Sequence, residues 1–402
     1  MAFSNTAALR LELERALPER PFSVSFWDGT SVPATSPDAP TFSVRSPKAL
    51  ATLLRAPGEL GLGRAYAQGL IEVDDIDGAI SVVDNFEAPT ITLKSGAKLA
   101  LALLRANGLT LPPAPPATEL RLRGERHTIA RDRRAVRHHY DSGNDFFKLF
   151  LDPSMTYSCA YWRNGATTLE EAQKAKLDLI CKKLDLQPGE RLLDVGCGWG
   201  SMALNAARER GVKVLGISLS QPQVDEATKR AAEQGLSELV VFRVCDYREV
   251  AESEFDAISS IGMVEHVGEE RIDLYMSTLH GLLRSGGRLL NHGIAKLADF
   301  DTKDEGAISE RFVFPDGVPL PLSRIAKAME RTGLVPQHVE GIGPDYALTI
   351  TEWIKRYEAR YDEAVALAGE ERARMYKLYL RAARQGFTTN WATVYQVLAT
   401  KL

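Results

Sequence analysis

The chain has 402 residues, a length that favours two or three domains over one. Hydrophobic residues make up 45% and charged residues 25% of it, as in soluble globular proteins, and the net charge of −4 disfavours a bulk polyanion binder. Its four cysteines, Cys159, Cys181, Cys197 and Cys245, lack metal-ligand spacing and fit a reducing cytoplasm. No apolar run reaches the ~18 residues of a membrane span, and the first residues lack a signal-peptide pattern. We therefore expect a cytoplasmic protein without a metal site.

Residues 1–107 are typical of a small α+β domain. An amphipathic helix is predicted within the first 17 residues, and FSVSFWDGTSV predicts a hairpin that turns at Asp28-Gly29. TFSVRS is a further strand. Ser46 and Pro47 are typical of a helix start, and LGRAYAQGLIEV, residues 62–73, has a helical pattern. This domain is expected to serve in lipid docking or dimerisation.

Residues 108–124 contain a cluster of prolines and predict a stiff linker to a domain at 125–402. A basic stretch overlaps its end. Between Arg121 and His139 there are seven arginines, 121, 123, 126, 131, 133, 134 and 137, against two acids. This stretch is either a solvated, salt-bridged surface or a contact for the phosphate head groups of a membrane.

From residue 186 onward, apolar strands alternate with helical segments. RLLDVG, KVLGISL, VVFRVCD, FDAISSIGM and GGRLLNHGI are strands, and LVPQHVEGI and WATVYQVLATKL are expected to close the sheet. Strands that alternate with helices indicate a mostly parallel sheet covered on both faces. The predicted fold class is α/β, a Rossmann-like domain with a mostly parallel, seven-stranded sheet plus the small α+β N-terminal domain.

The turn after the first of these strands, LLDVGCGWG, contains Asp194, Gly196, Gly198 and Gly200. Glycines allow a ligand to approach the backbone closely at a helix N-terminus. A dinucleotide site is the alternative, but its spacing is GxGxxG and it needs an acidic residue about 20 positions later. GISLSQPQ offers Ser218 and Ser220 there instead. The turn resembles motif I of S-adenosylmethionine-dependent methyltransferases.

Further motifs extend this resemblance over most of the chain. HYDSGNDFFKLFLDPSMTYSCAYW, GISLSQPQ, CDYRE, SIGMVEHVG and FPDGVPLPLSRI occur in that order. Together they resemble the cyclopropane-fatty-acyl-phospholipid synthase family, whose phospholipid-acting members also have a small extra N-terminal domain. The family includes relatives that make methylene-branched acyl chains.

The resemblance implies the residues that bind S-adenosylmethionine. Tyr157 and Ser158 match a pair that closes over the cofactor, and the glycines line its amino-acid end. The further implied contacts are Asp194, Ser218, Leu219, Gln223, Asp246 and Tyr247. Tyr247 is alternatively a packed aromatic residue.

The resemblance also implies a bound bicarbonate ion as the base of the reaction. Methyl transfer to an alkene leaves a carbocation that must be shielded from water and must lose a proton. The implied ligands are Cys159, Glu265, His292, the backbone of Ile294, and Tyr346. Glu265 and His292 are expected at strand tips. Cys159 and His292, each taken alone, are more often core residues, and His266 is expected to be structural.

Three functions remain open at this level. The first is synthesis of cyclopropane acyl chains on membrane phospholipid. The second is a fatty-acyl methyltransferase that makes a methylene-branched chain, and the third is a lipid-binding module with a relict cofactor site. The expected partners are phospholipid acyl chains and a second copy of the chain in a homodimer. The protein is also expected to contact the anionic inner face of the membrane peripherally. No nucleic-acid partner is expected.

Overall fold

The computed structural model describes residues 6–87, 89, 92–122, 124–140, 142–297 and 307–402. Met1 to Asn5, Arg123 of the basic stretch and Asp141 of the aromatic motif therefore lie outside the described residues. The chain forms two compact units. The first contains the residues up to Glu119, the segment 307–312 and the segment Ala368–Gln385. The second contains the rest and carries the candidate site.

The first unit is a four-stranded sheet, in the order β2-β1-β3-β4, with helices packed on it. Its strands are β1 Ser23–Phe26, β2 Ser31–Val32, β3 Thr41–Val44 and β4 Ile71–Val73. Its helices are α1 Ala7–Ala16, α2 Pro47–Arg55, α3 Glu59–Ala67, α4 Ile76–Asn85, α5 Leu93–Asn107, α12 Ala307–Phe312 and most of α16 Glu370–Thr388. The core includes Leu9, Phe26, Leu50 and Ala106.

Local signals in this unit are largely confirmed. β1 and β2 form the predicted hairpin, with Gly29 at a φ of +79° in its turn. Ser46 caps α2, because its side chain accepts a hydrogen bond from the Lys48 N–H at 3.2 Å. The prediction of one helix over LGRAYAQGLIEV is wrong at its end. The helix stops at Ala67, and Ile71–Val73 pair with β3 as strand β4.

The first unit also recruits sequence-distant segments. Arg374 of α16 donates to the Tyr66 carbonyl at 2.7 Å and to Glu72 at 2.9 Å. Residues 108–119, predicted as part of a linker, are held on this unit: Arg64 forms an ion pair with Glu119 at 2.6 Å. The unit boundaries therefore differ from the predicted ranges 1–107, 108–124 and 125–402.

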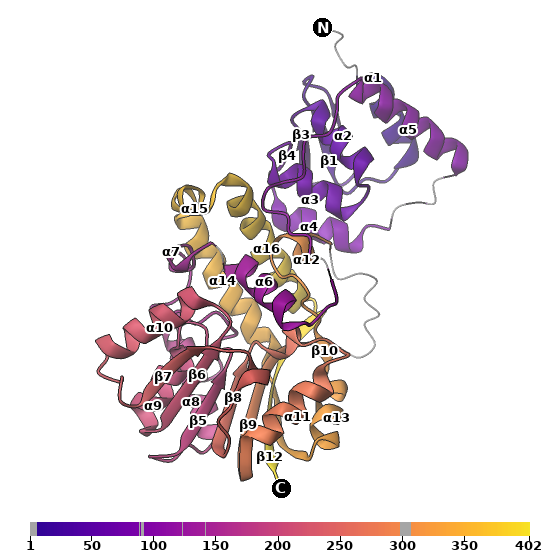
Figure 1. Cartoon of the computed structure of the whole chain (residues 1–402). Helices are drawn as coiled ribbons and strands as arrows, with labels where there is room; N and C mark the ends of the chain where they lie inside the picture. The colour runs from indigo at the N-terminus through magenta and orange to yellow at the C-terminus, as the bar shows by residue number, and fades with distance from the viewer. Residues whose placement is uncertain (1–5, 88, 90–91, 123, 141, 298–306) are drawn as a thin grey trace. The chain divides into compact units, whose positions relative to one another are not determined.

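The second unit contains the predicted α/β sheet, with strand order β11-β12-β9-β8-β5-β6-β7 (Figure 1). The strands are β5 Arg191–Val195, β6 Lys213–Ser218, β7 Val240–Val244, β8 Phe255–Ile261, β9 Leu283–Lys296, β11 Leu334–Gly341 and β12 Ala392–Lys401. All seven predicted strands are present. Over the described residues an eighth, β10 Leu320–Pro321, pairs with β9. β12 runs antiparallel to both its neighbours, while the other pairs are parallel, so the sheet is mostly parallel as predicted.

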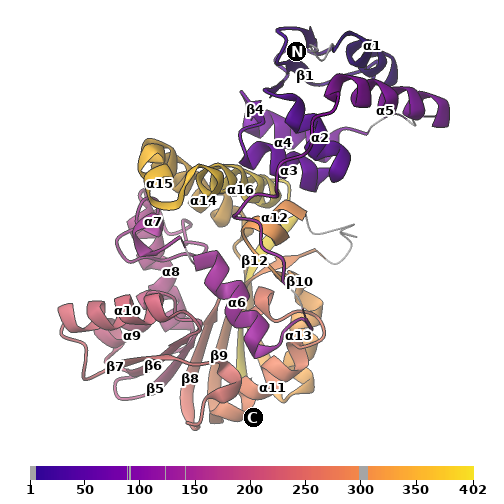
Figure 2. The ribbon, with the colours of Figure 1, turned by 45° about the horizontal axis from the view of Figure 1, so that its top comes forward.

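Helices cover both faces of this sheet (Figure 2). They are α8 Leu169–Lys183, α9 Ser201–Arg210, α10 Gln221–Glu233, α11 Ile272–Leu282 and α13 Leu322–Arg331. Helices α14 Gly343–Ala359 and α15 Tyr361–Ala368 lie beyond the end of the strands, and α6 Ile129–Tyr140, the short α7 Asn144–Phe147 and the single turns η1 Tyr247–Glu249 and η2 Val264–His266 lie in connections (Figure 2). Leu192 and Leu290 pack with α8 and α9 on one face. Leu193 and Leu289 pack with α11 and α13 on the other. Because side chains alternate along a strand, Asp194 and His292 point to the face that α8 covers.

Candidate active site: a pocket beside a buried acid and imidazole

A pocket lies at the carboxyl ends of β5, β6, β7 and β8, where ligands collect in open parallel sheets. Of the residues predicted for the cofactor, all except Gly200 line it: Tyr157, Ser158, Asp194, Gly196, Gly198, Ser218, Leu219, Gln223, Asp246 and Tyr247. Gly196 and Gly198 have φ values of +74° and +54°, which glycine adopts without steric cost. The glycine turn therefore presents backbone to the pocket.

Gly200, unlike the other predicted glycines, does not line the pocket. It precedes α9 with a φ of +85°. A Cβ at this position would lie 2.7 Å from Phe242 and 3.1 Å from Ala227. Close packing of the turn against β7 and α10 therefore requires a glycine here.

Asp194 is buried at the edge of the pocket. Its Oδ1 accepts a hydrogen bond from Ser259, the residue opposite it on β8, at 2.7 Å. Among the described residues its Oδ2 has no hydrogen-bond partner. Burial raises the pKa of Asp194 to about 6, against the lowering effects of Ser259, of the charge on Lys176 and of the Ala203 backbone N–H at the start of α9. Oδ2 of Asp194 therefore makes no close hydrogen bond within the described residues and can accept one from a ligand.

Gln223, at the start of α10, leaves a buried donor. The Ser218 hydroxyl donates to Gln223 Oε1 at 2.8 Å, which directs the amide nitrogen the other way. Within the described part of the chain Nε2 of Gln223 has no partner. A ligand with both an ammonium group and hydroxyl groups satisfies this donor and the Asp194 acceptor together.

Asp246 and Tyr247 follow β7 as predicted. Both carboxylate oxygens of Asp246 accept from Arg248 at 2.7 Å, so the acid is already held in place. Tyr247 packs edge-on against Tyr275, with ring centroids 4.9 Å apart, and burial raises its pKa to about 12. Tyr247 is therefore both a packed aromatic residue and part of the pocket lining.

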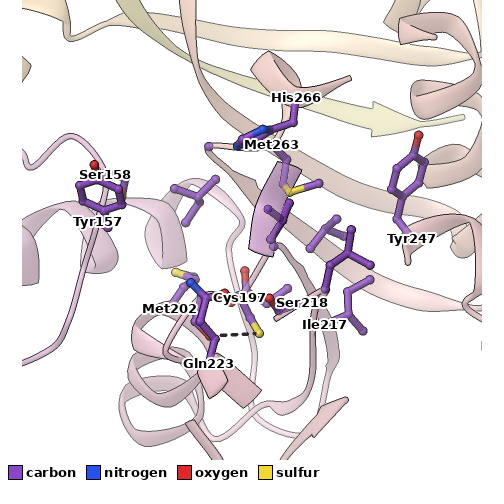
Figure 3. A pocket seen from close by; sticks show the side chains of 18 of the residues that line it. Tyr157, Ser158, Cys197, Met202, Ile217, Ser218, Gln223, Tyr247, Met263 and His266 are labelled. Carbon is purple, nitrogen blue, oxygen red and sulfur yellow. Dashed lines mark hydrogen bonds between the residues drawn. The ribbon is translucent and has the colours of Figure 1, made fainter. Parts of the chain in front are cut away.

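Tyr157 and Ser158 lie on the opposite side of the pocket from Tyr247 (Figure 3). They belong to the predicted aromatic segment, His139 to Trp162. The Tyr157 ring packs against His139, Phe147, Phe150 and Trp353. The indole of Trp199, within the glycine turn, donates to Asn144 at 2.8 Å. The aromatic segment is thereby joined to the glycine turn and forms an apolar wall.

Lys176 of α8 is a pocket residue that sequence analysis missed. Its side chain is fully buried, and its Nζ donates to the Ser158 hydroxyl at 2.9 Å. Burial lowers the pKa of Lys176 to about 8, while the nearby Cys159, Asp152 and Asp194 raise it. This lysine occupies a buried helix face, where an apolar residue is the usual expectation.

The residues predicted to hold an anion do not line the pocket, although Cys159, Glu265 and His292 each lie next to a residue that does. Glu265, in η2, follows the lining residues Gly262 and Met263. Burial raises its pKa to about 7, against the lowering effect of the backbone N–H groups of Glu265 and Ile294. Among the described residues Oε2 of Glu265 has no hydrogen-bond partner. The structure therefore brings Glu265 and Ile294 together.

His292 and Ile294 are not at a strand tip, because β9 continues to Lys296 and pairs there with β12. His292 instead lies opposite Ile261, the last residue of β8. Gln396 of β12 meets its Nδ1 at 3.1 Å. Burial, with Lys176 and Lys183 nearby, holds the pKa of His292 well below its usual value. The ring is therefore neutral at pH 7.

Cys159 and Tyr346 belong to the segments that meet at the start of α14. Cys159 is fully buried and its Sγ lies 3.7 Å from the Ile342 carbonyl. Burial raises its pKa, so it remains a thiol. Tyr346, in the first turn of α14, packs on Phe387 and Trp353. Ile342 in turn hydrogen-bonds Val394, which pairs with Ile294.

His266, expected to be structural, lines the pocket. Its ring packs on Phe314 with centroids 4.4 Å apart, and burial lowers its pKa to about 4. His127 and Met263 line the same pocket and were also missed by sequence analysis. His127 lies in the loop before α6, outside the quoted motifs, whereas Met263 lies within SIGMVEHVG, a motif from which only Glu265 and His266 were considered.

The basic stretch divides into buried and exposed arginines. Arg131 of α6 is buried, and its Nε and Nη2 donate to Asp316 at 2.6 and 2.7 Å. Arg133, Arg134 and Arg137 are exposed on the same helix, and Arg133 pairs with Glu249 at 3.1 Å. Across the described ranges, no helix combines the length and the apolar character that a membrane span needs.

Comparison with known proteins shows the family to which the chain is related. A family model described as mycolic acid cyclopropane synthetase matches residues 127–397. A probable fatty acid methyltransferase of Mycobacterium tuberculosis is 39% identical over 98% of this chain and 94% of its own length. The cyclopropane-fatty-acyl-phospholipid synthase of Escherichia coli K12 is 34% identical over 85% of this chain and 83% of its own.

The fold of the second unit has a solved counterpart. The crystal structure of a mycolic acid cyclopropane synthase complexed with SAH and CTAB matches with a TM-score of 0.64 and 34% identity. The match covers 67% of this chain and 98% of the solved one. The α/β fold class is thereby confirmed.

Proposed function

The chain belongs to the mycolic acid cyclopropane synthetase family of S-adenosylmethionine-dependent methyltransferases, and we propose that it cyclopropanates unsaturated acyl chains of membrane phospholipid. The observation that carries the proposal is the pocket at the carboxyl ends of β5 to β8, with the buried side chains of Glu265 and His292 close to its lining. When bound, S-adenosylmethionine supplies an electrophilic methyl group for the cis double bond of the acyl chain.

The pocket residues fit this methyl donor. The unpaired Oδ2 of Asp194 accepts from an ammonium group, and the Gln223 amide donates to a hydroxyl or carboxylate. Gly196 and Gly198 allow close approach of the amino-acid end. Tyr157 and Trp199 contribute the apolar wall that excludes water, which protects a cationic acyl intermediate from hydration.

The second group of residues fits a bicarbonate ion. Bicarbonate, when bound, supplies the base that removes a proton from the acyl cation. The neutral His292 ring offers a donor, and the Cys159 thiol can offer one in exchange for its contacts with the Ala160 and Ile342 carbonyls. Glu265, with a pKa of about 7, is half protonated near neutral pH and therefore need not repel an anion. Lys176 places a buried positive charge near both Cys159 and His292.

A methylene-branched product is the second candidate function. The relative with 39% identity is named a fatty acid methyltransferase and not a cyclopropane synthase. The same acyl cation gives a methylene branch when a different proton leaves. Catalytic hydrogenation of the product separates the two, because a methylene group takes up hydrogen under conditions that leave a cyclopropane ring intact.

We also propose that the enzyme reaches its lipid substrate by docking peripherally on an anionic membrane surface, through the exposed arginines of α6. Each arginine near such a surface contributes about 1 kcal/mol. Helix α3 offers little surface for the docking or dimerisation role expected of the N-terminal domain, since Ala65, Tyr66 and Ala67 are buried within the first unit. A homodimer and a cytoplasmic location remain predictions.

The test of this function is turnover with controlled bicarbonate. Purified protein is assayed with S-adenosylmethionine and vesicles of a cis-unsaturated phospholipid in carbonate-free buffer, then with bicarbonate restored. We expect activity to fall and recover. Glu265→Gln should retain binding of S-adenosylmethionine but lose about 100-fold in turnover. Full activity without bicarbonate would exclude the proposed base.

A further inference from the structure

A row of polar side chains crosses the sheet next to the proposed anion site. In the strand register, Glu340 of β11 lies opposite Gln396 of β12, and Gln396 lies opposite His292 of β9. Directly opposite residues on neighbouring strands project to the same face of a sheet. Glu340, Gln396 and His292 therefore lie side by side on the face that α8 covers.

Lys183, in the last turn of α8, contacts this row from the helix that covers this face of the sheet. Its Nζ donates to Gln396 Oε1 at 2.6 Å and to Glu340 Oε2 at 2.5 Å. The Glu340 carboxylate also accepts from the Tyr161 hydroxyl at 3.3 Å. The side chain of Lys183 is only 9% exposed, and Gln396 is fully buried. Lys183 is thus held by an acid and by an amide, away from competing water.

The chemistry of lysine fixes which way the Gln396 amide faces. An ammonium group only donates hydrogen bonds, so the atom of Gln396 that meets Lys183 must be the carbonyl oxygen. The NH₂ group then faces His292 Nδ1, 3.1 Å away. Because an amide NH₂ only donates, Nδ1 of His292 must accept and carries no proton. The single proton of the neutral ring is then on Nε2.

We propose that Lys183 and Gln396 are positioning residues that hold His292 in its Nε2–H tautomer, as a donor toward the anion site. The inference rests on the proposed function for the identity of the anion, but the tautomer follows from the hydrogen bonds alone. A histidine free to exchange tautomers presents an acceptor lone pair to the anion for part of the time. Lys183 and Gln396 prevent this without touching the substrate.

Gln396→Glu is the most direct test, because it changes one atom's chemistry and little of the shape. One oxygen of the new carboxylate accepts a hydrogen bond from Lys183. The other oxygen can only accept as well, so His292 Nδ1 must carry a proton to hydrogen-bond with it. We expect the proton to move to Nδ1. Turnover should fall at least 10-fold, the bicarbonate concentration for half-maximal activity should rise, and affinity for S-adenosylmethionine should stay unchanged.

The tautomer is read by NMR of the full-length protein labelled with nitrogen-15 histidine. Protonated and unprotonated ring nitrogens have well-separated chemical shifts, and the signals that disappear in His292→Gln belong to His292. We expect Nε2–H in the wild type at neutral pH and Nδ1–H in Gln396→Glu. An Nδ1–H or doubly protonated ring in the wild type would overturn the proposal, as would a Gln396→Glu spectrum identical to that of the wild type.

Lys183→Gln is the second variant, in case Gln396→Glu does not fold. It removes the donor-only group, so the Gln396 amide is free to reverse and His292 should show a mixture of tautomers. A single unchanged Nε2–H tautomer in this variant would also overturn the proposal.

The matched control is Lys182→Gln, at the neighbouring exposed position of α8, which should leave spectrum and turnover unchanged. The spectra need neither cofactor nor bicarbonate, so a failure of the bicarbonate assay would contradict the proposed function and leave this result standing.

Discussion

The carboxyl group of Glu265 is a buried acid whose protonation changes near neutral pH. Its pKa is raised from 4.5 to about 7 by burial. Between these two values the unfolded chain has already lost the proton that the folded chain keeps. The contribution of Glu265 to stability therefore decreases as pH rises from about 4.5 to about 7, by about 3 kcal/mol in all.

Glu265→Gln removes this charge and should make the protein more stable than the wild type at alkaline pH. We expect a gain in the free energy of unfolding of up to about 3 kcal/mol near pH 8, and little difference near pH 4.5. Denaturant titrations at the two pH values measure it. Glu238→Gln, at an exposed position, is the control and should show no such trend. A gain for Glu265→Gln that does not vary with pH would contradict the buried, shifted carboxyl.

Gly196 tests the cofactor pocket at the level of a single residue. A side chain at this φ of +74° would lie 2.5 Å from the Met263 sulfur and occupy pocket space. We expect Gly196→Val to abolish binding of S-adenosylmethionine in calorimetry. Gly189→Val is matched for backbone strain, with a φ of +85°, but nothing lies within 4 Å of its Cβ. It should bind normally, and equal loss in both variants would show that strain and not pocket space is responsible.

Most of the cofactor residues that the motifs select line one pocket, but the motifs could not supply their hydrogen-bond partners. Asp194 and Gln223 belong to motifs that identify them, whereas Ser259 and Lys176 become visible only in three dimensions. Lys176 and Lys183 are about two turns apart on α8, in a sequence typical of an ordinary charged helix. Their burial depends on how α8 packs on the sheet, which sequence periodicity does not specify.

At the scale of elements, helix α6 carries the exposed arginines of the predicted docking surface. Arg131 is unsuitable for lipid contact because it is buried against Asp316, so its substitution would report on folding. The exposed residues are Arg133, Arg134 and Arg137. Replacing these three by Gln should weaken sedimentation with anionic vesicles on the order of 100-fold at low salt, since each contributes about 1 kcal/mol.

The control for charge alone is Lys174→Gln, Lys213→Gln and Lys229→Gln, three exposed lysines on other elements of the second unit. This variant has the same net charge as the α6 variant. It should bind vesicles as the wild type does, and binding of all three proteins should weaken as salt rises. Equal binding by the α6 variant and the wild type would mean that α6 is a solvated surface.

Boundaries of elements were harder to predict than their existence. The helical pattern in LGRAYAQGLIEV extends past Gly69, but Ile71–Val73 gain backbone hydrogen bonds from β3. Similarly, β9 extends to Lys296 because β12 pairs with its end. In both cases a partner distant in sequence overrides the local pattern.

At the scale of the whole molecule, the two units do not correspond to two continuous stretches of the sequence. The α/β order of the second unit follows from alternating strands and helices, which local patterns reveal. The first unit instead includes α12 and most of α16, from the C-terminal third of the chain. Arg374 attaches α16 to Tyr66 and Glu72. Local sequence patterns do not predict these contacts, because the partners are distant in the sequence.

The most direct test of the central claim is the mass of the acyl chains after reaction. Purified protein is incubated with S-adenosylmethionine and vesicles of a cis-monounsaturated phospholipid, and the released fatty acids are analysed by mass spectrometry. We predict acyl chains heavier by one CH₂ group, unchanged in mass by hydrogenation, absent without S-adenosylmethionine and strongly reduced with Glu265→Gln. Acyl chains of unchanged mass, from a protein that still binds S-adenosylmethionine and the vesicles, would contradict the account and fit a lipid-binding module.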